Sequence, residues 1–95
     1  MSVVVGFLSI HLHLSSARSL KDKRMVLRRL KDRLKKFNVA VAETDHHDLW
    51  QRAELSVVAV SNDGVAVDQS LTSVCREIER VEPGCITHTQ VEFLR

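Results

Sequence analysis

The 95-residue chain has little of what cofactor-binding or disulfide-stabilised proteins depend on. It contains two cysteines, one proline, three glycines and no tyrosine. Cys75 and Cys85 belong to no CxxC pair and to no histidine pattern with zinc-ligand spacing, which argues against a disulfide framework and a zinc knuckle. Asn62-Asp63-Gly64 lacks the length and the lysine of a phosphate loop. We therefore expect reduced cysteines, no cofactor, no metal and no catalytic residue.

Long apolar runs are also missing. The first fourteen residues lack a basic start and a small-residue cleavage site, and no run approaches the roughly 20 apolar residues that cross a bilayer. A hydrophobic share of 44 % with 27 % charged residues is typical of a soluble globular domain. Because no proline-, glycine- or serine-rich linker divides the chain, we expect a single domain over residues 1–95, located in the cytoplasm.

Apolar periodicity predicts six elements in the order βαββαβ. Alternation of apolar and polar residues predicts four strands, over 3–14, 39–44, 52–61 and 85–94. Apolar residues spaced by three and four predict two helices, over 20–37 and 67–81. This order predicts a ferredoxin-like α+β sandwich, in which a four-stranded antiparallel sheet carries both helices on one face.

Polar residues mark the ends of the predicted helices. Ser19 and the Asn62-Asp63-Gly64 stretch are suited to cap the two N-termini, and Asn38 suits the left-handed position after the first helix. Lys23 falls within the apolar stripe of the first helix. Its stem is expected to lie along apolar surface while its amine reaches water.

The first predicted helix is strongly basic. Ten of the fourteen basic residues fall between Arg18 and Lys36 with only two acids, so this segment carries +8 and the rest of the chain −6. Like charges four residues apart repel, so a row of unbalanced cations costs stability and indicates a surface that binds a polyanion. A solvent-exposed helix face, or a face that contacts acidic residues of a partner subunit, has the same sequence pattern. The candidate nucleic-acid-binding residues form a row with three neighbours: Lys21, Arg24, Arg28, Lys31 and Lys35, with Arg29, Arg33 and Lys36.

The sheet face without helices is predicted to be partly apolar. By strand alternation, this face is expected to carry the side chains of Phe7, Val58 and Val60 and of two alanines of the second strand. A sheet face this apolar is commonly covered by another subunit. We therefore expect a homodimer. Base recognition of the RRM kind is not predicted, because the third strand has no aromatic residue to stack on bases. The candidate interface residues are Phe7, His11, His13, Val58, Val60 and Trp50.

Histidines add a polar cluster to the same face. His11 and His13 point to this side, where the last strand adds His88, so three imidazoles can approach one another. A metal site needs about four ligands in tight geometry, and a polar patch on an open or dimeric face is the simpler interpretation. The loop from Asp45 to Arg52 holds two further histidines, but its side chains should diverge, with the aspartates bonding local backbone N–H groups. Trp50 in this loop either anchors it against the core, the interpretation we favour, or fills a partner's pocket.

Four stretches of the chain, taken in order, resemble a known family. They are Ser19-Leu-Lys-Asp-Lys-Arg24, Phe37-Asn-Val-Ala-Val-Ala-Glu43, Asp45-His-His-Asp-Leu-Trp-Gln-Arg-Ala53 and Val60-Ser-Asn-Asp63. Together they resemble the YlxP-like family of small bacterial proteins over essentially the whole chain. The resemblance implies a ferredoxin-like fold and supplies no catalytic residue. Members are often encoded beside transcription and translation factors, which implies an RNA-linked role.

These observations favour a non-enzymatic binding protein. We predict that its first helix contacts structured RNA or a ribonucleoprotein such as the ribosome through backbone phosphates, with little sequence preference. One alternative is a homodimeric protein-interaction module whose basic helix meets an acidic protein surface. Another is an enzyme or metal protein that uses His11, His13 and His88, or the loop from Asp45 to Asp48.

Overall fold

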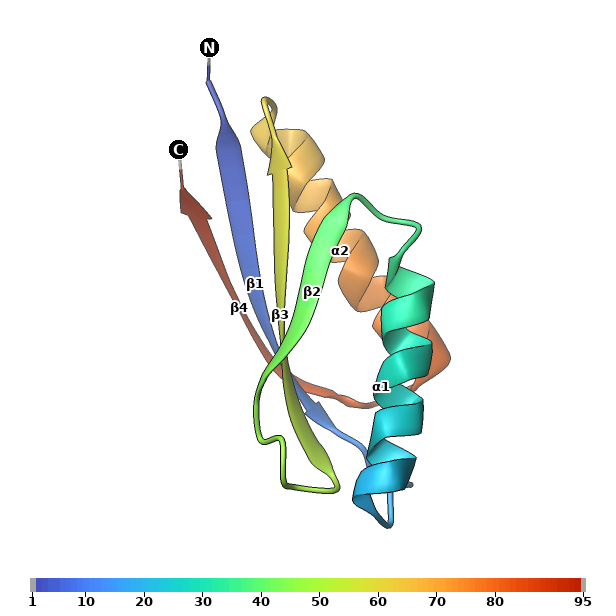
Figure 1. Cartoon of the computed structure of the whole chain (residues 1–95). Helices are drawn as coiled ribbons and strands as arrows, with labels where there is room; N and C mark the ends of the chain where they lie inside the picture. The colour runs from blue at the N-terminus through green and yellow to red at the C-terminus, as the bar shows by residue number, and fades with distance from the viewer. Residues whose placement is uncertain (1, 95) are drawn as a thin grey trace.

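The computed structural model describes residues 2–94 and confirms the predicted order of elements (Figure 1). The strands are β1 (Val4–His13), β2 (Val39–Asp45), β3 (Arg52–Ser61) and β4 (Ile86–Leu94). The helices are α1 (Leu20–Leu34) and α2 (Gly64–Val81). The strands form one antiparallel sheet in the order β2-β3-β1-β4, and both helices cover the same face. The fold is therefore the predicted ferredoxin-like α+β sandwich.

The core lies between the helices and the sheet. Alternate residues of β1 and β3 are buried on this side, and each helix adds a stripe of apolar residues at helical spacing. The buried hydrophobic residues of the two central strands are Val4, Leu8, Ile10, Leu12, Ala53, Leu55, Val57 and Ala59. Those of the helices are Leu27, Leu30, Leu34, Val67, Leu71, Val74 and Ile78. Within residues 2–94, no helix is long and apolar enough to span a membrane.

The helix α2 packs closely against β1 at Gly6. A Cβ atom at this position would lie 2.4 Å from Cγ1 of Val67 and 2.9 Å from Cδ1 of Leu71. These distances are shorter than carbon atoms tolerate, so the missing side chain of Gly6 is what lets α2 pack at this depth.

Both predicted N-terminal caps are present. The backbone N–H of Asp22 donates to Oγ of Ser19 at 3.0 Å, and that of Val65 donates to Oδ1 of Asp63 at 3.0 Å. Each cap satisfies an N–H group that has no partner inside its helix, and so fixes where the helix begins.

The C-terminal end of α1 differs from the prediction. The helix ends at Leu34, and Asn38 does not adopt the left-handed conformation, so that prediction is wrong. Instead, the backbone N–H of Lys35 donates to the carbonyl of Asp32, and that of Phe37 donates to the carbonyl of Leu34. These tight turns satisfy the last carbonyls without a left-handed residue.

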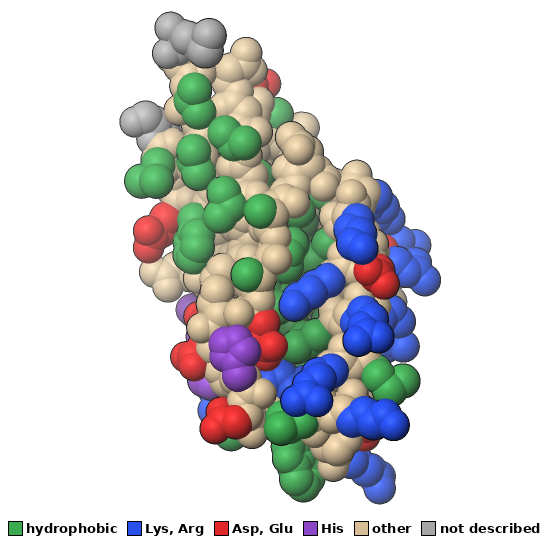
Figure 2. Space-filling model, viewed as in Figure 1, with side chains coloured by type: hydrophobic (Ala, Val, Ile, Leu, Met, Phe, Trp, Pro, Cys, Tyr) green, Lys and Arg blue, Asp and Glu red, His purple; other side chains and the backbone are tan. Residues whose placement is uncertain are grey.

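The opposite face of the sheet carries no helix. Towards the chain ends it is apolar: Phe7 pairs with Val58, and Val5 pairs with Val60 and Leu94. Val60 is 51 % exposed and Leu94 66 %, while Phe7 and Val58 are half-buried. Figure 2 shows hydrophobic side chains gathered over this end, with histidines and acids further along the sheet. The predicted parity of the open face is therefore confirmed.

Candidate nucleic-acid interface

The predicted basic row runs along the side of α1 that faces β2. Four of its members, Arg24, Arg28, Lys31 and Lys35, line a groove between the helix and the strand. Helical spacing continues the row to Lys21 near the start of α1. Figure 2 shows lysine and arginine side chains along this groove, with hydrophobic side chains between helix and sheet. The row is therefore a continuous positive border on one side of α1.

Most of these cations have no acidic partner in the part of the chain that the structure describes. No ion pair forms at Lys21, Arg24, Arg28, Lys31 or Arg33. Lys35 pairs with Asp32 at 3.1 Å, but both side chains are largely exposed, and such pairs contribute little to stability. The row consequently keeps most of its positive charge available to a ligand.

Two of the eight candidates serve a structural role on the other side of α1. Lys36 lies 3.0 Å from Oε1 of Glu77, a buried residue of α2, and Arg29 pairs with Glu82 just after α2. Arg80 donates two hydrogen bonds to Glu77, at 2.5 and 2.7 Å. Hydrogen bonds from Arg80 and then Lys36 lower the pKa of Glu77, against the opposing effect of burial. These contacts stabilise the packing of α1 on α2.

Lys23 lies beneath the groove. The expectation that its amine reaches water is wrong: the residue is 2 % exposed. Its Nζ lies 2.9 Å from Oε2 of Glu43 on β2 and donates a hydrogen bond to the carbonyl of His46. Oε2 of Glu43 accepts no hydrogen bond among the described residues. The carboxylate of Glu43 is therefore held beside the amine of Lys23 by the attraction between their opposite charges. The pair joins α1 to the end of β2.

The loop between β2 and β3 is fixed at both ends. At its start, the backbone N–H of His46 donates to Oδ1 of Asp45 at 2.7 Å, a predicted local bond, and the carbonyl of His46 accepts from Lys23. His46 has a left-handed backbone, with φ of 63°. At its end, the side-chain amide of Gln51 donates to the carbonyl of Ala17 at 3.1 Å. The loop is therefore an ordered part of the fold.

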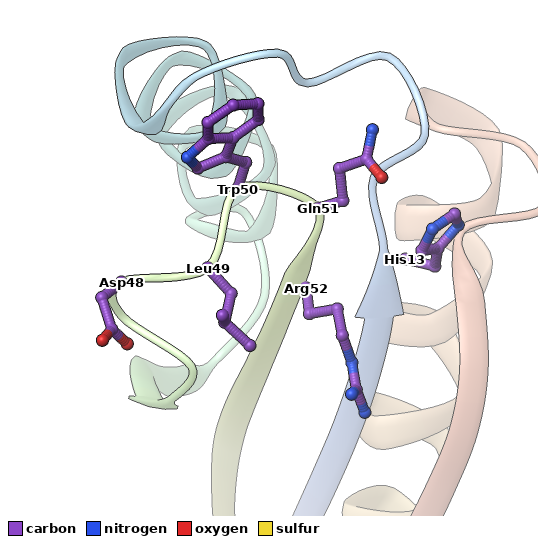
Figure 3. Close-up of a pocket in the computed structure, with 6 residues that line it drawn as sticks. All are labelled: His13, Asp48, Leu49, Trp50, Gln51 and Arg52. Atoms are coloured by element: carbon purple, nitrogen blue, oxygen red, sulfur yellow. The ribbon is translucent and has the colours of Figure 1, made fainter.

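Trp50 lies in the middle of this loop and is 54 % exposed, beside Leu49 at 41 %. The prediction that Trp50 anchors the loop against the core is wrong, because polar contacts at Gln51 and His46 hold the loop in its place. Figure 3 shows Trp50 at a pocket on the surface. The pocket is lined by His13, Asp48, Leu49, Trp50, Gln51 and Arg52.

The structure brings together some of the predicted histidines. The ring centroids of His11 and His88 lie 5.5 Å apart on the open face, as the parity predicts. His13 joins the Trp50 pocket instead, because the β1–β4 register shifts after His11. His46 takes its place, 6.5 Å from His11, and Oε1 of Glu54 lies 3.3 Å from Nε2 of His11. Among residues 2–94, no group of three or more histidine, cysteine or acidic side chains has the geometry to hold a metal ion.

The two cysteines are free thiols. Burial, and then the charge of Glu79, raises the pKa of both, that of Cys85 to about 11. A raised pKa disfavours the reactive thiolate, and Cys85 is buried while Cys75 is half-buried.

Comparison with known proteins gives the chain its family. The family described as a protein of unknown function, DUF503, matches residues 5–91. The uncharacterized protein YlxP of Bacillus subtilis (strain 168) is 36 % identical over 77 residues, which are 80 % of this chain and 84 % of that protein. The resemblance carried by the four sequence stretches is thereby confirmed.

Solved structures with the same fold have distant sequences. The de novo designed protein Foldit4 matches with a TM-score of 0.60 and 16 % identity, over 99 % of this chain and 98 % of its own. A C-terminal segment of the alpha subunit of aIF2 from Pyrococcus abyssi matches with a TM-score of 0.54 and 22 % identity, over 100 % of this chain and 51 % of that one. At such identities the likeness is one of fold alone. By sequence, the chain belongs to the DUF503 family of proteins of unknown function, together with YlxP.

Proposed function

We propose that this protein is a cytoplasmic, non-enzymatic binding protein that contacts structured RNA or a ribonucleoprotein through the basic side of α1. One observation carries the proposal: the cations Lys21, Arg24, Arg28 and Lys31 lie in one row beside a groove and have no acidic partner among the described residues. Phosphate groups supply the missing negative charge.

The energetics of the row support a charged ligand. Like charges three or four residues apart on a helix destabilise it by roughly 0.2–0.5 kcal/mol per pair. Among the described residues, the one ion pair within the row is the exposed contact of Lys35 with Asp32, which offsets little of this repulsion. Neighbouring cations are about 5–6 Å apart along the helix surface. A phosphate backbone presents its charges as a regular series and is contacted by lysine and arginine largely without regard to sequence.

The test is a titration of a labelled structured RNA with the purified protein across a salt series. For single strands the logarithm of the binding constant falls with the logarithm of salt by about 0.7 per phosphate contact, and for duplexes by about 0.9. We expect the triple variant Lys21→Glu, Arg24→Glu, Arg28→Glu to flatten this slope and abolish most binding.

A single-site comparison controls for net charge. Arg28→Gln removes an exposed arginine from the row, and Arg76→Gln removes an exposed arginine from α2. We expect the slope to fall by roughly one contact for Arg28→Gln and to stay unchanged for Arg76→Gln. Absence of RNA binding by the wild-type protein at low salt would refute the proposal and direct attention to an acidic protein partner.

The open sheet face supports a second proposal, that the protein is a homodimer. With ten residues in each central strand, a rise of about 3.3 Å per residue and four strands about 4.8 Å apart, this face covers roughly 600 Å². Pairing two such faces buries roughly 1,200 Å², the lower end of the range for specific interfaces. The apolar side chains around Phe7 and Val58 supply the hydrophobic part of this interface.

Two matched valines test the dimer. Val60 on the open face is 51 % exposed, and Val65 on α2 is 64 % exposed. We expect sedimentation velocity to show dimers for the wild type and for Val65→Asp, and monomers for Val60→Asp. A monomeric wild-type protein at tens of micromolar would rule this dimer out.

A further inference from the structure

The chain's single tryptophan is exposed on a loop whose ends are fixed. Lys23 holds the loop at His46 and Ala17 holds it at Gln51, so the indole of Trp50 is presented by an ordered backbone. An aromatic residue that is rigidly presented and half open to water is typical of a contact surface, because binding covers a large apolar area at little cost in conformational entropy.

The loop that carries this tryptophan lies beside the start of the basic row. The hydrogen bond from Lys23 to His46 places the loop against the first turn of α1, where Lys21 and Arg24 begin the row. Figure 1 shows the β2–β3 loop and the start of α1 at the same end of the molecule. A polyanion that follows the row towards the start of α1 therefore arrives at the pocket of Trp50.

The chemistry of the pocket suits a nucleobase. Trp50 offers an aromatic face, and His13 and Arg52 contribute imidazole and guanidinium groups from the ends of β1 and β3. Gln51, which points to the same side of the loop as Trp50 in Figure 3, adds a side-chain amide of the kind that binds base edges, whereas the carboxylate of Asp48 points away from the indole. The lining of this pocket therefore combines one aromatic side chain with polar ones, unlike a purely apolar socket for a protein side chain.

Resting on the proposed function, we infer that the Trp50 pocket receives an unpaired base of the RNA whose phosphates α1 binds. The preferred ligand is then an RNA with a loop, bulge or single-stranded end beside a structured segment. Splayed bases are commonly recognised by stacking on aromatic side chains, whereas a base inside a regular duplex has no free face to offer.

Intrinsic fluorescence makes this inference directly testable. Because the chain has one tryptophan and no tyrosine, its emission reports on residue 50 alone. The probes are a hairpin RNA with an unpaired loop and a blunt duplex with the same stem, each titrated at low salt. We expect the hairpin to quench the emission and to bind more tightly, and the duplex to bind without quenching.

Variants separate stacking from other causes. We expect Trp50→Ala to weaken hairpin binding by roughly 5- to 150-fold, the effect of losing one stacked base, and to leave duplex binding unchanged. Trp50→Phe should retain much of the hairpin affinity, because it keeps an aromatic face. Val65→Ala, at an exposed position on α2 that lies outside the pocket, is the control and should have little effect. Circular dichroism verifies that each variant is folded.

The outcomes distinguish this inference from the function on which it rests. If the wild type binds neither RNA, the proposed function itself fails. If both RNAs bind equally, with no quenching and no effect of Trp50→Ala, the stacking inference is overturned while phosphate binding by α1 stands. Loss of dimers in Trp50→Ala, with RNA affinity intact, would likewise overturn it and assign the residue to a protein interface.

Discussion

Replacing Lys23 with methionine will destabilise the protein by removing one charge from a buried ion pair. Methionine keeps most of the apolar stem that packs in the core, so the change acts chiefly on the amine. Without the amine, the Glu43 carboxylate, which is only 17 % exposed, loses its ion-pair partner, and the carbonyl of His46 loses its donor.

The expected cost is a large share of the total stability. Breaking a buried ion pair by removing one partner typically costs about 3–5 kcal/mol. Because part of the Glu43 carboxylate reaches water, we expect about 2–4 kcal/mol for Lys23→Met. A domain of this size has a total unfolding free energy of about 5–14 kcal/mol. The double variant Lys23→Met, Glu43→Met buries no unpaired charge, so it should be more stable than the sum of its single variants implies.

Urea denaturation followed by circular dichroism measures these differences. Lys31→Met is the matched control, since Lys31 is a half-buried lysine of the same helix without an ion pair, and we expect a change within about 0.5 kcal/mol. The reasoning is refuted if Lys23→Met is no more destabilising than Lys31→Met. Additivity in the double variant would also contradict it, because it would mean that the two charges do not interact.

Two further predictions follow from the packing of α2. The contacts of Glu77 with Arg80 and Lys36 hold the pKa of its carboxyl below the ordinary value of about 4.5. These contacts therefore stabilise the folded state at pH values above 4.5. The stabilisation is lost as the pH falls through the lowered pKa, because the carboxyl then becomes protonated. The Glu77→Gln variant should therefore be less stable than the wild type at neutral pH, and the two stabilities should converge in acid. Urea denaturation midpoints at a series of pH values measure this difference. A difference that does not change with pH would contradict the prediction. Gly6→Ala should cost about 1–3 kcal/mol, because its methyl group meets Val67, and an unchanged thermal midpoint would show that α2 shifts freely.

The fold could be predicted from the sequence because its signals are local and repeated. In β3, the buried residues Ala53, Leu55, Val57 and Ala59 alternate with more exposed ones. This alternation predicts both that the segment is a strand and where the strand begins and ends. The order of elements then left one common topology with right-handed crossovers. The open face followed from parity, since each strand must place its alternate residues on opposite sides.

The details of the site depend on partners that are distant in the sequence. Lys23 falls in an apolar stripe, but only the contacts with Glu43 of β2 and His46 of the following loop explain why its amine can be buried. Likewise, helical spacing showed that Arg29 and Lys36 flank the basic row, but not that acids at the far end of α2 would pair with them. The left-handed turn at His46 has no clear sequence signal, so its approach to His11 was missed.

The placement of both helices on one face affects how many ligands an assembled molecule can hold. Two copies joined through their open faces would present their α1 helices outward, on opposite sides of the pair. Such an arrangement is bivalent: once one helix is bound, the second meets its ligand at a high effective concentration, and the combined affinity can exceed that of a single helix by about 10²–10⁴. If both proposals hold, a dimer of this kind would connect two segments of RNA, and a substitution in the sheet would weaken binding without touching a single cation.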